Sequence, residues 1–344
     1  MTWRTPFLIA LGLVLTACSP PAQSGPSGPT SAANPTSAST PAAGRTKLTV
    51  SYSNVIADSM PLWTAKEAGY FSQNGLDVDL QYIASSNAFA ALLAGQVQAN
   101  AGGGSEVVSG VANGADVVVV ANLVPVYPYF MEAQPSIKSP EDLKGKNVAI
   151  TNPGATFDIA TRVVLQRNGI DPDKDVTFIK TGSVQNVESA LLSGQVEAGL
   201  AQVPDTLAVE AGGLHPLFDL ASLNLPAAGT VVAVQRSFVS GQREVVQKLV
   251  DSIVQAAARN KQDKAFAIQV LKKYLKNDDD TAMGATYDYF TQKVTPVLPY
   301  PRPEQFADSV KVLSEQNPRV KDVDVGKLLD PSFVQSAADR KLGG

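Results

Sequence analysis

The sequence is poor in the side chains that most often carry catalysis or bind metals. Its 344 residues include one cysteine, Cys18, and one histidine, His215. A single cysteine excludes an internal disulfide framework. The histidine has no cysteine or recurring acidic partner at metal-ligand spacing, so it does not form a metal-binding motif. We interpret His215 as structural or solvated, and we expect neither a metal site nor a cofactor.

Recognised catalytic motifs are also missing. There is no Gly-x-Ser-x-Gly nucleophile elbow, and the acidic residues show no spacing that marks a general acid/base pair. The glycine run at 102–104 lacks both the Gly-Lys-Ser/Thr ending of a phosphate loop and the Gly-x-Gly-x-x-Gly pattern. No residue is therefore marked as catalytic, and we do not expect an enzyme.

Charge of one sign is not concentrated in any part of the chain. Lys and Arg number 28, Asp and Glu number 32, and the formal net charge is −4. This excludes the basic patch that a nucleic-acid-binding protein needs, and no basic amphipathic helix is present. The apolar run from Phe7 to Ala17 is shorter than the roughly 20 residues that span a bilayer, so we expect no transmembrane helix.

The amino-terminal segment has the features of a targeting signal. Arg4 precedes the apolar run, which ends in Leu-Thr-Ala-Cys at residues 15–18. This ending resembles the lipobox of bacterial lipoproteins, which implies lipidation of Cys18. Residues 1–18 are therefore predicted to be a lipoprotein signal peptide, and residues 19–46, rich in Pro, Ser, Ala and Thr, a disordered linker. We expect a lipid anchor on the extracytoplasmic side of a membrane, in the periplasm or at the cell surface.

The remaining chain contains an internal duplication. Ala91 to Ala99 and Ala190 to Ala198 are identical at seven of nine aligned positions, and similar strand and helix patterns surround both stretches. Strands joined by crossover helices predict parallel pairing, and two such units of about 100 residues predict two α/β lobes. We expect residues 47–126 and 235–344 to form the first lobe and residues 127–234 the second, with a strand at 230–234 returning to the first. The third strand of each unit is expected to start at Gln96 or Gln195. After the return strand, apolar residues from Val245 to Val254 recur at helical spacing and predict a helix with one buried face.

A cleft between two lobes would collect the loops that come after the strands, because open α/β sheets bind ligands at the carboxyl ends of their strands. Small and polar residues in these loops can offer hydroxyls, amides and free backbone N–H groups. We expect Tyr127 and Tyr129, on the crossing segment, to stack on a planar ligand or to fill the hinge. The candidate ligand-binding residues are Asn54, Asp58, Ser59, Ser86, Asn87, Ser105, Tyr127, Asn152, Gly154, Ala155, Thr156, Gln202 and Asp205.

Several stretches carry a family resemblance. They are Pro61 to Phe71, Asn74 to Val78, Ala91 to Gly95, Ser139 to Ala149 and Ala190 to Ala198. With these and the lipobox, the chain resembles the substrate-binding lipoproteins of bacterial ABC importers, in the branch of nitrate, sulfonate and taurine uptake (SsuA/THI5-like, NMT1-like). The resemblance implies a type II periplasmic-binding-protein-like fold with a ligand cleft between two lobes. Each lobe would be a mixed, mostly parallel sheet flanked by helices. The lobes would close on a small solute and deliver it to a permease with its ATPase. We expect a monomer.

The identity of the solute stays open at this point. The expected cleft loops contain Asp58, Glu106, Asp158 and Asp205 but no Lys or Arg, although Arg162 lies one turn into a nearby helix. A sulfonate or taurine-like solute, nitrate, an amine and a heterocyclic vitamin precursor are all candidates. The alternatives to a transport receptor are an enzyme on the same fold and a ligand-sensing surface lipoprotein.

Overall fold

The structure is a computed structural model that describes residues 44–344, apart from the side chains of Ser85 and Ser86. The predicted signal peptide, Cys18 and nearly all of the predicted linker lie outside the described residues. The described part forms one compact unit. Its first strand begins at Thr46, the last residue of the predicted linker.

The first sheet has five strands in the order β2-β1-β3-β10-β4. Strand β1 runs parallel to β2 and β3, whereas β10 runs antiparallel to β3 and β4, so the sheet is mixed as expected. The strands are β1 (Thr46–Tyr52), β2 (Leu76–Tyr82), β3 (Ala99–Gly102), β4 (Val117–Val124) and β10 (Thr230–Gln235).

Side chains of this sheet alternate between two cores. On β4, Val118 and Val120 join one cluster of buried apolar residues, whereas Val117 and Val119 join another. This period of two places one core on each face of the sheet. The helices packed on the Val118 face are α1 (Met60–Glu67), α2 (Tyr70–Gln73), α8 (Arg236–Gln262), α9 (Lys264–Leu275), α10 (Asp280–Tyr289) and α13 (Ser332–Asp339). Those on the Val119 face are α3 (Ser85–Leu93), α4 (Gly104–Ala112), α11 (Ala307–Gln316) and α12 (Val325–Leu328).

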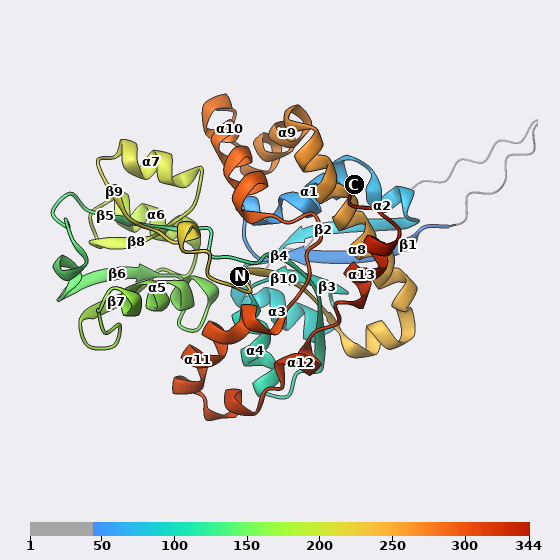
Figure 1. Ribbon diagram of the computed structural model, residues 1–344, viewed down its shortest axis with the longest axis horizontal. Coiled ribbons are helices and arrows are strands. Elements are labelled where there is room, and N and C mark those ends of the chain that lie inside the picture. Colours follow the sequence, from blue (N-terminus) through green and yellow to red (C-terminus); the bar gives the residue numbers. More distant parts are fainter. Residues whose placement is uncertain (1–43) are drawn as a thin grey trace, which may run out of the picture. The chain divides into compact units, whose positions relative to one another are not determined.

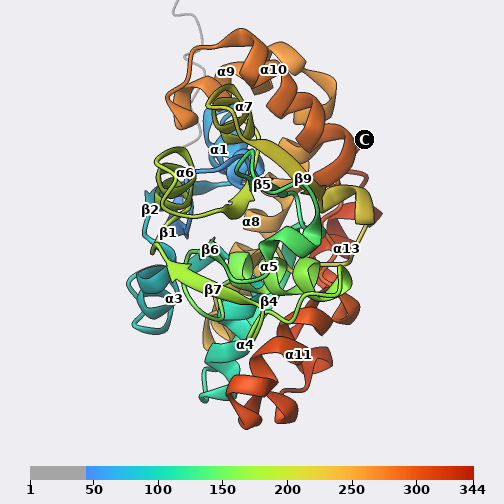
Figure 2. The same cartoon turned by 90° about the vertical axis from the view of Figure 1, so that its left-hand side faces the viewer.

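The second sheet repeats this plan with the order β7-β6-β8-β5-β9. Strand β6 is parallel to β7 and β8, and β5 is antiparallel to β8 and β9. The strands are β5 (Phe130–Ala133), β6 (Lys146–Ile150), β7 (Val176–Lys180), β8 (Ala198–Ala201) and β9 (His215–Asp219). Figures 1 and 2 show α5 (Thr156–Arg167) on one face of this sheet, and α6 (Val184–Leu192) and α7 (Asp205–Ala211) on the other.

The duplicated sequence occupies equivalent places in the two lobes. Helices α3 and α6 each end before a glycine with φ of 71°, Gly95 and Gly194, and the chain then enters β3 or β8. A left-handed residue after a helix favours glycine, which has no Cβ to clash. The repeated Leu-Leu-x-Gly is therefore a helix end in both lobes.

Long helix α8 confirms the helical pattern expected after the return strand. Val246, Leu249, Val250 and Ile253 lie on one face and are fully buried against the first sheet. The helical backbone is interrupted at Gln242, near its start. Short helical turns complete the chain at η1 (Ala57–Ser59), η2 (Pro140–Leu143), η3 (Ala221–Leu223), η4 (Phe290–Val294), η5 (Pro303–Phe306) and η6 (Pro318–Asp322).

Two segments, 125–129 and 220–229, cross between the sheets, and they lie side by side. The amide of Ala227 donates to the carbonyl of Pro125 at 2.8 Å, and that of Gly229 donates to Val124 at 3.0 Å. The second crossing ends before Thr230, because β10 already belongs to the first sheet. The first lobe therefore resumes at 230, not at 235 as the expected bounds had it.

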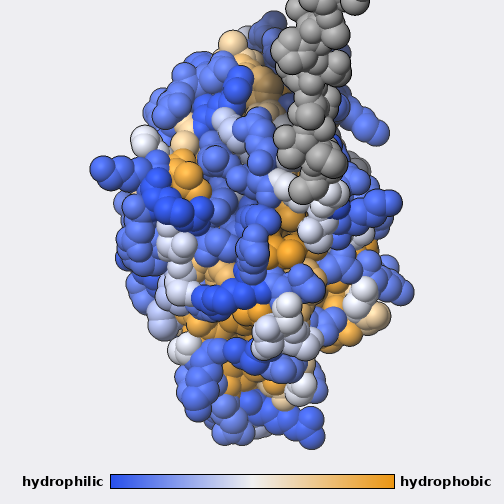
Figure 3. All heavy atoms as spheres, turned by 90° about the vertical axis from the view of Figure 1, so that its right-hand side faces the viewer, coloured by the Kyte–Doolittle hydropathy of each residue, from blue (hydrophilic) through white to orange (hydrophobic). Residues whose placement is uncertain are grey.

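The outer face of the first lobe is covered mostly by hydrophilic residues, with apolar residues showing between them (Figure 3). Within residues 44–344, no helix is both long enough and apolar enough to cross a membrane.

Candidate ligand-binding site

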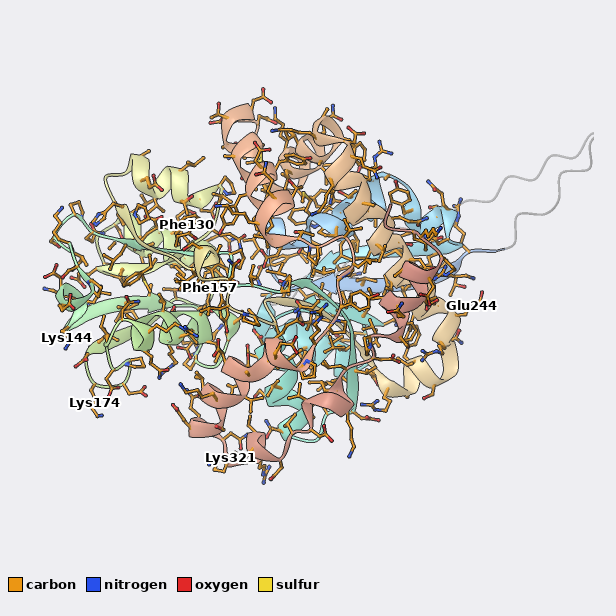
Figure 4. The ribbon with its side chains drawn as sticks, viewed as in Figure 1. Phe130, Lys144, Phe157, Lys174, Glu244 and Lys321 are labelled. Carbon is orange, nitrogen blue, oxygen red and sulfur yellow. The ribbon has the colours of Figure 1, made fainter. Side chains whose placement is uncertain are left out.

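A small cavity lies where the loops of the two lobes meet. Its volume is about 20 Å³, enough to hold a group the size of a water molecule. Figure 4 labels Phe157 and Phe130 in this region between the lobes. The cavity is lined by Asn54, Asp58, Gly103, Glu106, Gly229 and Thr230 of the first lobe, Thr151, Ala155, Thr156 and Phe157 of the second, and Tyr129 of the crossing segment.

Three of the lining residues come directly after strands of the two sheets. Asp58 lies in the turn η1 that comes after β1, and Glu106 lies in the first turn of α4 after β3. In the second lobe, Thr156 begins α5 after β6. Each residue therefore lies at the carboxyl end of a parallel strand, where ligands of open α/β sheets bind.

Asp58 connects the two lobes. Gln202 Nε2, after β8 of the second lobe, donates to Asp58 Oδ1 at 2.8 Å, and Thr230 Oγ1 donates to Oδ2 at 2.9 Å. Asp58 is only 2% exposed. Burial raises the pKa of Asp58 to about 6, although the hydrogen bonds from Thr230 and Gln202 act in the opposite direction.

A second hydrogen bond crosses the cleft nearby. Ser105 Oγ lies 3.2 Å from Thr156 Oγ1 and donates to Glu106 Oε2 at 2.8 Å. Either hydroxyl can be the donor in the Ser105–Thr156 pair. Burial raises the pKa of Glu106, and the hydrogen bonds to its carboxylate only partly offset that effect.

Gly103 allows this close approach. A Cβ atom at this position would lie 2.1 Å from Glu106 Oε2 and 2.3 Å from Thr156 Oγ1. Real Cβ contacts are not that short, so a side chain here would push against the second lobe. The missing side chain therefore lets the start of α4 meet the start of α5.

Arg162 does not supply positive charge to the cavity. Its Nε donates to Asp158 Oδ1 at 2.9 Å, its Nη1 donates to Asp173 Oδ1 at 2.7 Å, and its guanidinium lies 4.8 Å from the ring centre of Phe178. Asp158 also accepts from the amide of Gly154 at 2.7 Å. Both residues are thus engaged within the second lobe, and no Lys, Arg or His is among the residues that line the cavity.

Three groups of candidate residues lie at or beside the cavity. Asn54, Asp58, Ala155 and Thr156 line the cavity. Ser105 and Gln202 make the cross-lobe hydrogen bonds. Asn152 and Gly154 line a neighbouring groove.

The other candidates lie apart from the cavity lining. Ser59 is buried in η1, and Asn87 is exposed on α3. Tyr127 points its hydroxyl to Asp308 Oδ2 at 3.4 Å, and Asp205 begins α7, where burial and then the charge of Glu188 raise its pKa to about 7. The side chain of Ser86 lies outside the described part.

The list of candidate ligand-binding residues does not include seven of the lining residues: Gly103, Glu106, Tyr129, Thr151, Phe157, Gly229 and Thr230. Of these, Glu106 was expected in a cleft loop and Tyr129 on the crossing segment beside the ligand. Most of the seven lie at or next to the end of a strand, so the predicted strand ends would have been enough to include them among the candidates. Tyr129 differs, because it enters the cavity from the crossing segment and its ring packs 4.5 Å from that of Phe157. Only the path of the chain between the lobes brings it there.

The neighbouring groove is larger, at about 440 Å³. It lies between α3 and α4 of the first lobe, the loop at 152–155 of the second, and the α11–η6 segment. Glu106 and Ala155 line both the groove and the cavity, so the two spaces adjoin at these residues. The groove is lined by Phe89, Ala90, Leu93, Glu106, Ser109, Gly110, Asn113, Asn152, Pro153, Gly154, Ala155, Leu313, Gln316, Asn317 and Val320.

A family model described as NMT1/THI5 like matches residues 56–264, which include most of both lobes and most of the cavity lining. The chain belongs to the NMT1/THI5-like family. A curated relative, the Bacillus subtilis protein named "Putative binding protein YtlA", is 24% identical over 223 residues, which are 57% of this chain and 60% of that protein. The match thus spans less than two thirds of the relative's length.

Solved structures show that this family member has the fold of periplasmic binding proteins. The alkanesulfonate-binding protein SsuA of Xanthomonas axonopodis, bound to MOPS, is 20% identical with a TM-score of 0.70, covering 84% of this chain and 99% of SsuA. The nitrate-binding protein NrtA of Synechocystis is 15% identical with a TM-score of 0.69, and the match covers 86% of this chain and 89% of NrtA. The desulfurization enzyme DSZB is 17% identical with a TM-score of 0.62, and the match covers 86% of this chain and 100% of DSZB.

Burial of Asp58 predicts a pH-dependent stability. The pKa of Asp58 is raised from 3.8 to about 6 in the folded protein, so the folded state binds this proton more tightly than the unfolded state. The free energy of unfolding should therefore fall as pH rises between these values, by about 3 kcal/mol in total. Glu106 and Asp205 also have raised pKa values and titrate in both proteins, so urea unfolding across this range should show a decline that is larger in the wild type than in Asp58→Asn by this amount. Parallel curves for the two proteins would contradict the assignment.

Gly103→Ala should hold the lobes apart. The Glu106 carboxylate can rotate away from the new methyl group, but Thr156 Oγ1 lies on a short side chain at the start of α5. We expect a larger radius of gyration in small-angle X-ray scattering. Gly284→Ala on α10 is the control, because a Cβ there meets no atom within 4 Å. Equal radii for both variants would show that Gly103 does not limit closure.

Proposed function

We propose that this protein is the extracytoplasmic solute-binding component of an ABC importer. It captures a small organic solute in the cleft and delivers it to the permease and its ATPase. The observation that carries the proposal is that both lobes contribute side chains to one cavity. Asp58 with Gln202 and Ser105 with Thr156 join the lobes across it. A site completed only when the lobes meet couples binding to closure.

The fold neighbours support a solute rather than a macromolecule as the ligand. The names of SsuA and NrtA give alkanesulfonate and nitrate as the molecules they bind. Their likeness to this chain lies in the fold, so the solute must be argued from this cavity. Sulfonates, taurine, nitrate and heterocyclic vitamin precursors form the first panel to test.

The proposed anchor rests on the amino-terminal sequence. Cys18 would carry the lipid, and the Pro/Ser/Ala/Thr-rich residues up to about 46 would hold the folded unit away from the membrane surface. Each buried methylene of a lipid chain contributes about 0.8 kcal/mol, so two or more chains retain a protein stably. The receptor would then remain close to its permease.

An enzyme on the same fold is the second candidate. One of the fold neighbours, DSZB, is an enzyme, and two carboxyl groups with raised pKa face the cavity of this protein. We favour the receptor, because the cavity lining contains no cysteine or histidine to act as nucleophile or base. Recovery of a bound solute unchanged after long incubation distinguishes the two, since an enzyme would convert it.

Thr156→Arg should abolish solute binding while the fold is retained. The new side chain would fill a cavity of about 20 Å³ and block closure. A thermal-shift screen of the full chain tests this, because a solute at about 100 times its Kd stabilises by roughly 2.7 kcal/mol. Thr177→Arg is the matched control, since Thr177 is exposed on β7 of the same lobe. An unchanged shift in Thr156→Arg would remove this loop from the site.

Cys18→Ala should release the protein from the membrane. Without the thiol no lipid can be attached, so the variant is expected in the soluble extracytoplasmic fraction of a bacterial expression host, and the wild type in the membrane fraction. Solute-induced thermal shifts should be equal in both. Retention of the variant in the membrane fraction would count against lipid anchoring at this residue.

A further inference from the structure

The cavity is rich in groups that accept hydrogen bonds and contains no cationic side chain. Two carboxylates, Asp58 and Glu106, enter it from the first lobe. Hydroxyls of Thr151, Thr156 and Thr230 and the amide of Asn54 complete most of the polar lining. A ligand that donates hydrogen bonds would match this set, whereas an anion would meet two like charges.

Tyr129 provides an independent observation at the same place. It lines the cavity and is only 1% exposed, yet its hydroxyl has no hydrogen-bond partner within residues 44–344. Burial raises its pKa well above the usual value, and the charges of Asp58 and Glu106 add to this effect. The phenol therefore lies near both carboxylates, with its oxygen available to accept from a ligand.

Charge compensation favours a cation. Buried carboxylates are costly unless they are paired with positive charge or well hydrogen-bonded. Asp58 has a hydrogen bond on each carboxylate oxygen, and Glu106 is bonded to Ser105, but neither has a cationic partner among the described residues. A cation between them would relieve this cost, whereas a sulfonate or nitrate would increase it.

The adjoining groove indicates the chemistry of the remainder of the ligand. Phe89, Leu93 and Leu313 line it, and the space of about 440 Å³ is typical of sites for small organic molecules. The groove meets the cavity at Glu106 and Ala155. A ligand with a head the size of a water molecule and an apolar body could thus occupy both spaces.

We propose that the solute is a primary organic ammonium compound. Its ammonium group lies between Asp58 and Glu106 and donates to Tyr129, and its alkyl or aryl substituent extends past Ala155 into the groove. This inference rests on the proposed function as a solute receptor. It differs from the anionic solutes named for SsuA and NrtA.

Isothermal titration of the full chain with two ammonium compounds and two anions tests the inference. The probes are n-butylammonium and 2-phenylethylammonium against 1-butanesulfonate and nitrate, all at pH 7.5, where Asp58 is mostly ionised. We expect the ammonium compounds to bind and the anions not to bind. Binding of an anion without binding of either ammonium compound would overturn the cation assignment and leave the receptor function standing. If none of the four probes binds, the cation assignment is overturned. If none of the sulfonates, taurine, nitrate and heterocyclic vitamin precursors binds either, the receptor function is overturned as well.

Glu106→Gln tests the position of the ammonium group. The amide keeps the shape and can still accept from Ser105, but it removes the charge, so the Kd for 2-phenylethylammonium should rise at least about tenfold, or about 1.4 kcal/mol. Glu141→Gln is the control. Glu141 is exposed in η2 of the second lobe, beside Lys144, which Figure 4 places at the far end from the cleft. Equal affinities of Glu106→Gln and Glu141→Gln would overturn the placement.

Discussion

One buried carboxylate, Asp58, joins the two lobes where their loops meet. Asp58 comes from the first lobe, yet it accepts a hydrogen bond from Gln202, a residue of the second lobe 144 positions later in the chain. Because Asp58 is nearly fully buried, opening the lobes would give this group back to water and closing them requires a partner for it. The cost of burying Asp58 therefore links the distance between the lobes to whatever shares the cavity with it.

The topology makes that link possible. Each sheet takes one antiparallel strand, β5 or β10, directly after the chain has crossed from the other lobe. The two crossing segments lie side by side and are hydrogen-bonded to each other, so both chain connections between the lobes are at the same place. Helix α11 adds a contact from the far end of the chain, since Leu313 lines the same groove as the loop at 152–155 of the second lobe. The helices after β10 thus cover the first sheet and also shape the entrance to the cleft.

The fold does not decide which ligand is bound, whereas the charge of the cavity-lining side chains does. Neighbours with the same fold include proteins named for binding alkanesulfonate and nitrate and an enzyme. A fold of this kind presents loops at the strand ends, and a few side chains in those loops decide what is bound. Here the arginine nearest to the cleft, Arg162, is held by Asp158 and Asp173, so the positive charge that an anion would need stays inside the second lobe.

The sequence by itself determined the two-lobed α/β plan, because that plan rests on local patterns. The repeated Leu-Leu-x-Gly predicted two equivalent helix ends, and the apolar spacing from Val245 to Val254 predicted the buried face of α8. The loops after the strands were found for the same reason, which brought Asp58, Thr156 and Gln202 into the candidate set. The third strand of each unit was expected at Gln96 and Gln195, but β3 and β8 begin three residues later, because the chain first completes the turn after its helix.

Only the tertiary structure decided which loop residues meet. The pairing of Asp58 with Gln202, the place of Tyr129 beside two carboxylates, and the position of Asp205 away from the cavity result from the path of the crossing segments and the closure of the lobes. Periodicity and turn chemistry act over a few neighbouring residues, so they specify elements and their ends. The cross-lobe contacts of the site join residues 51 and 144 positions apart, and their geometry is set by how two separately packed sheets come together.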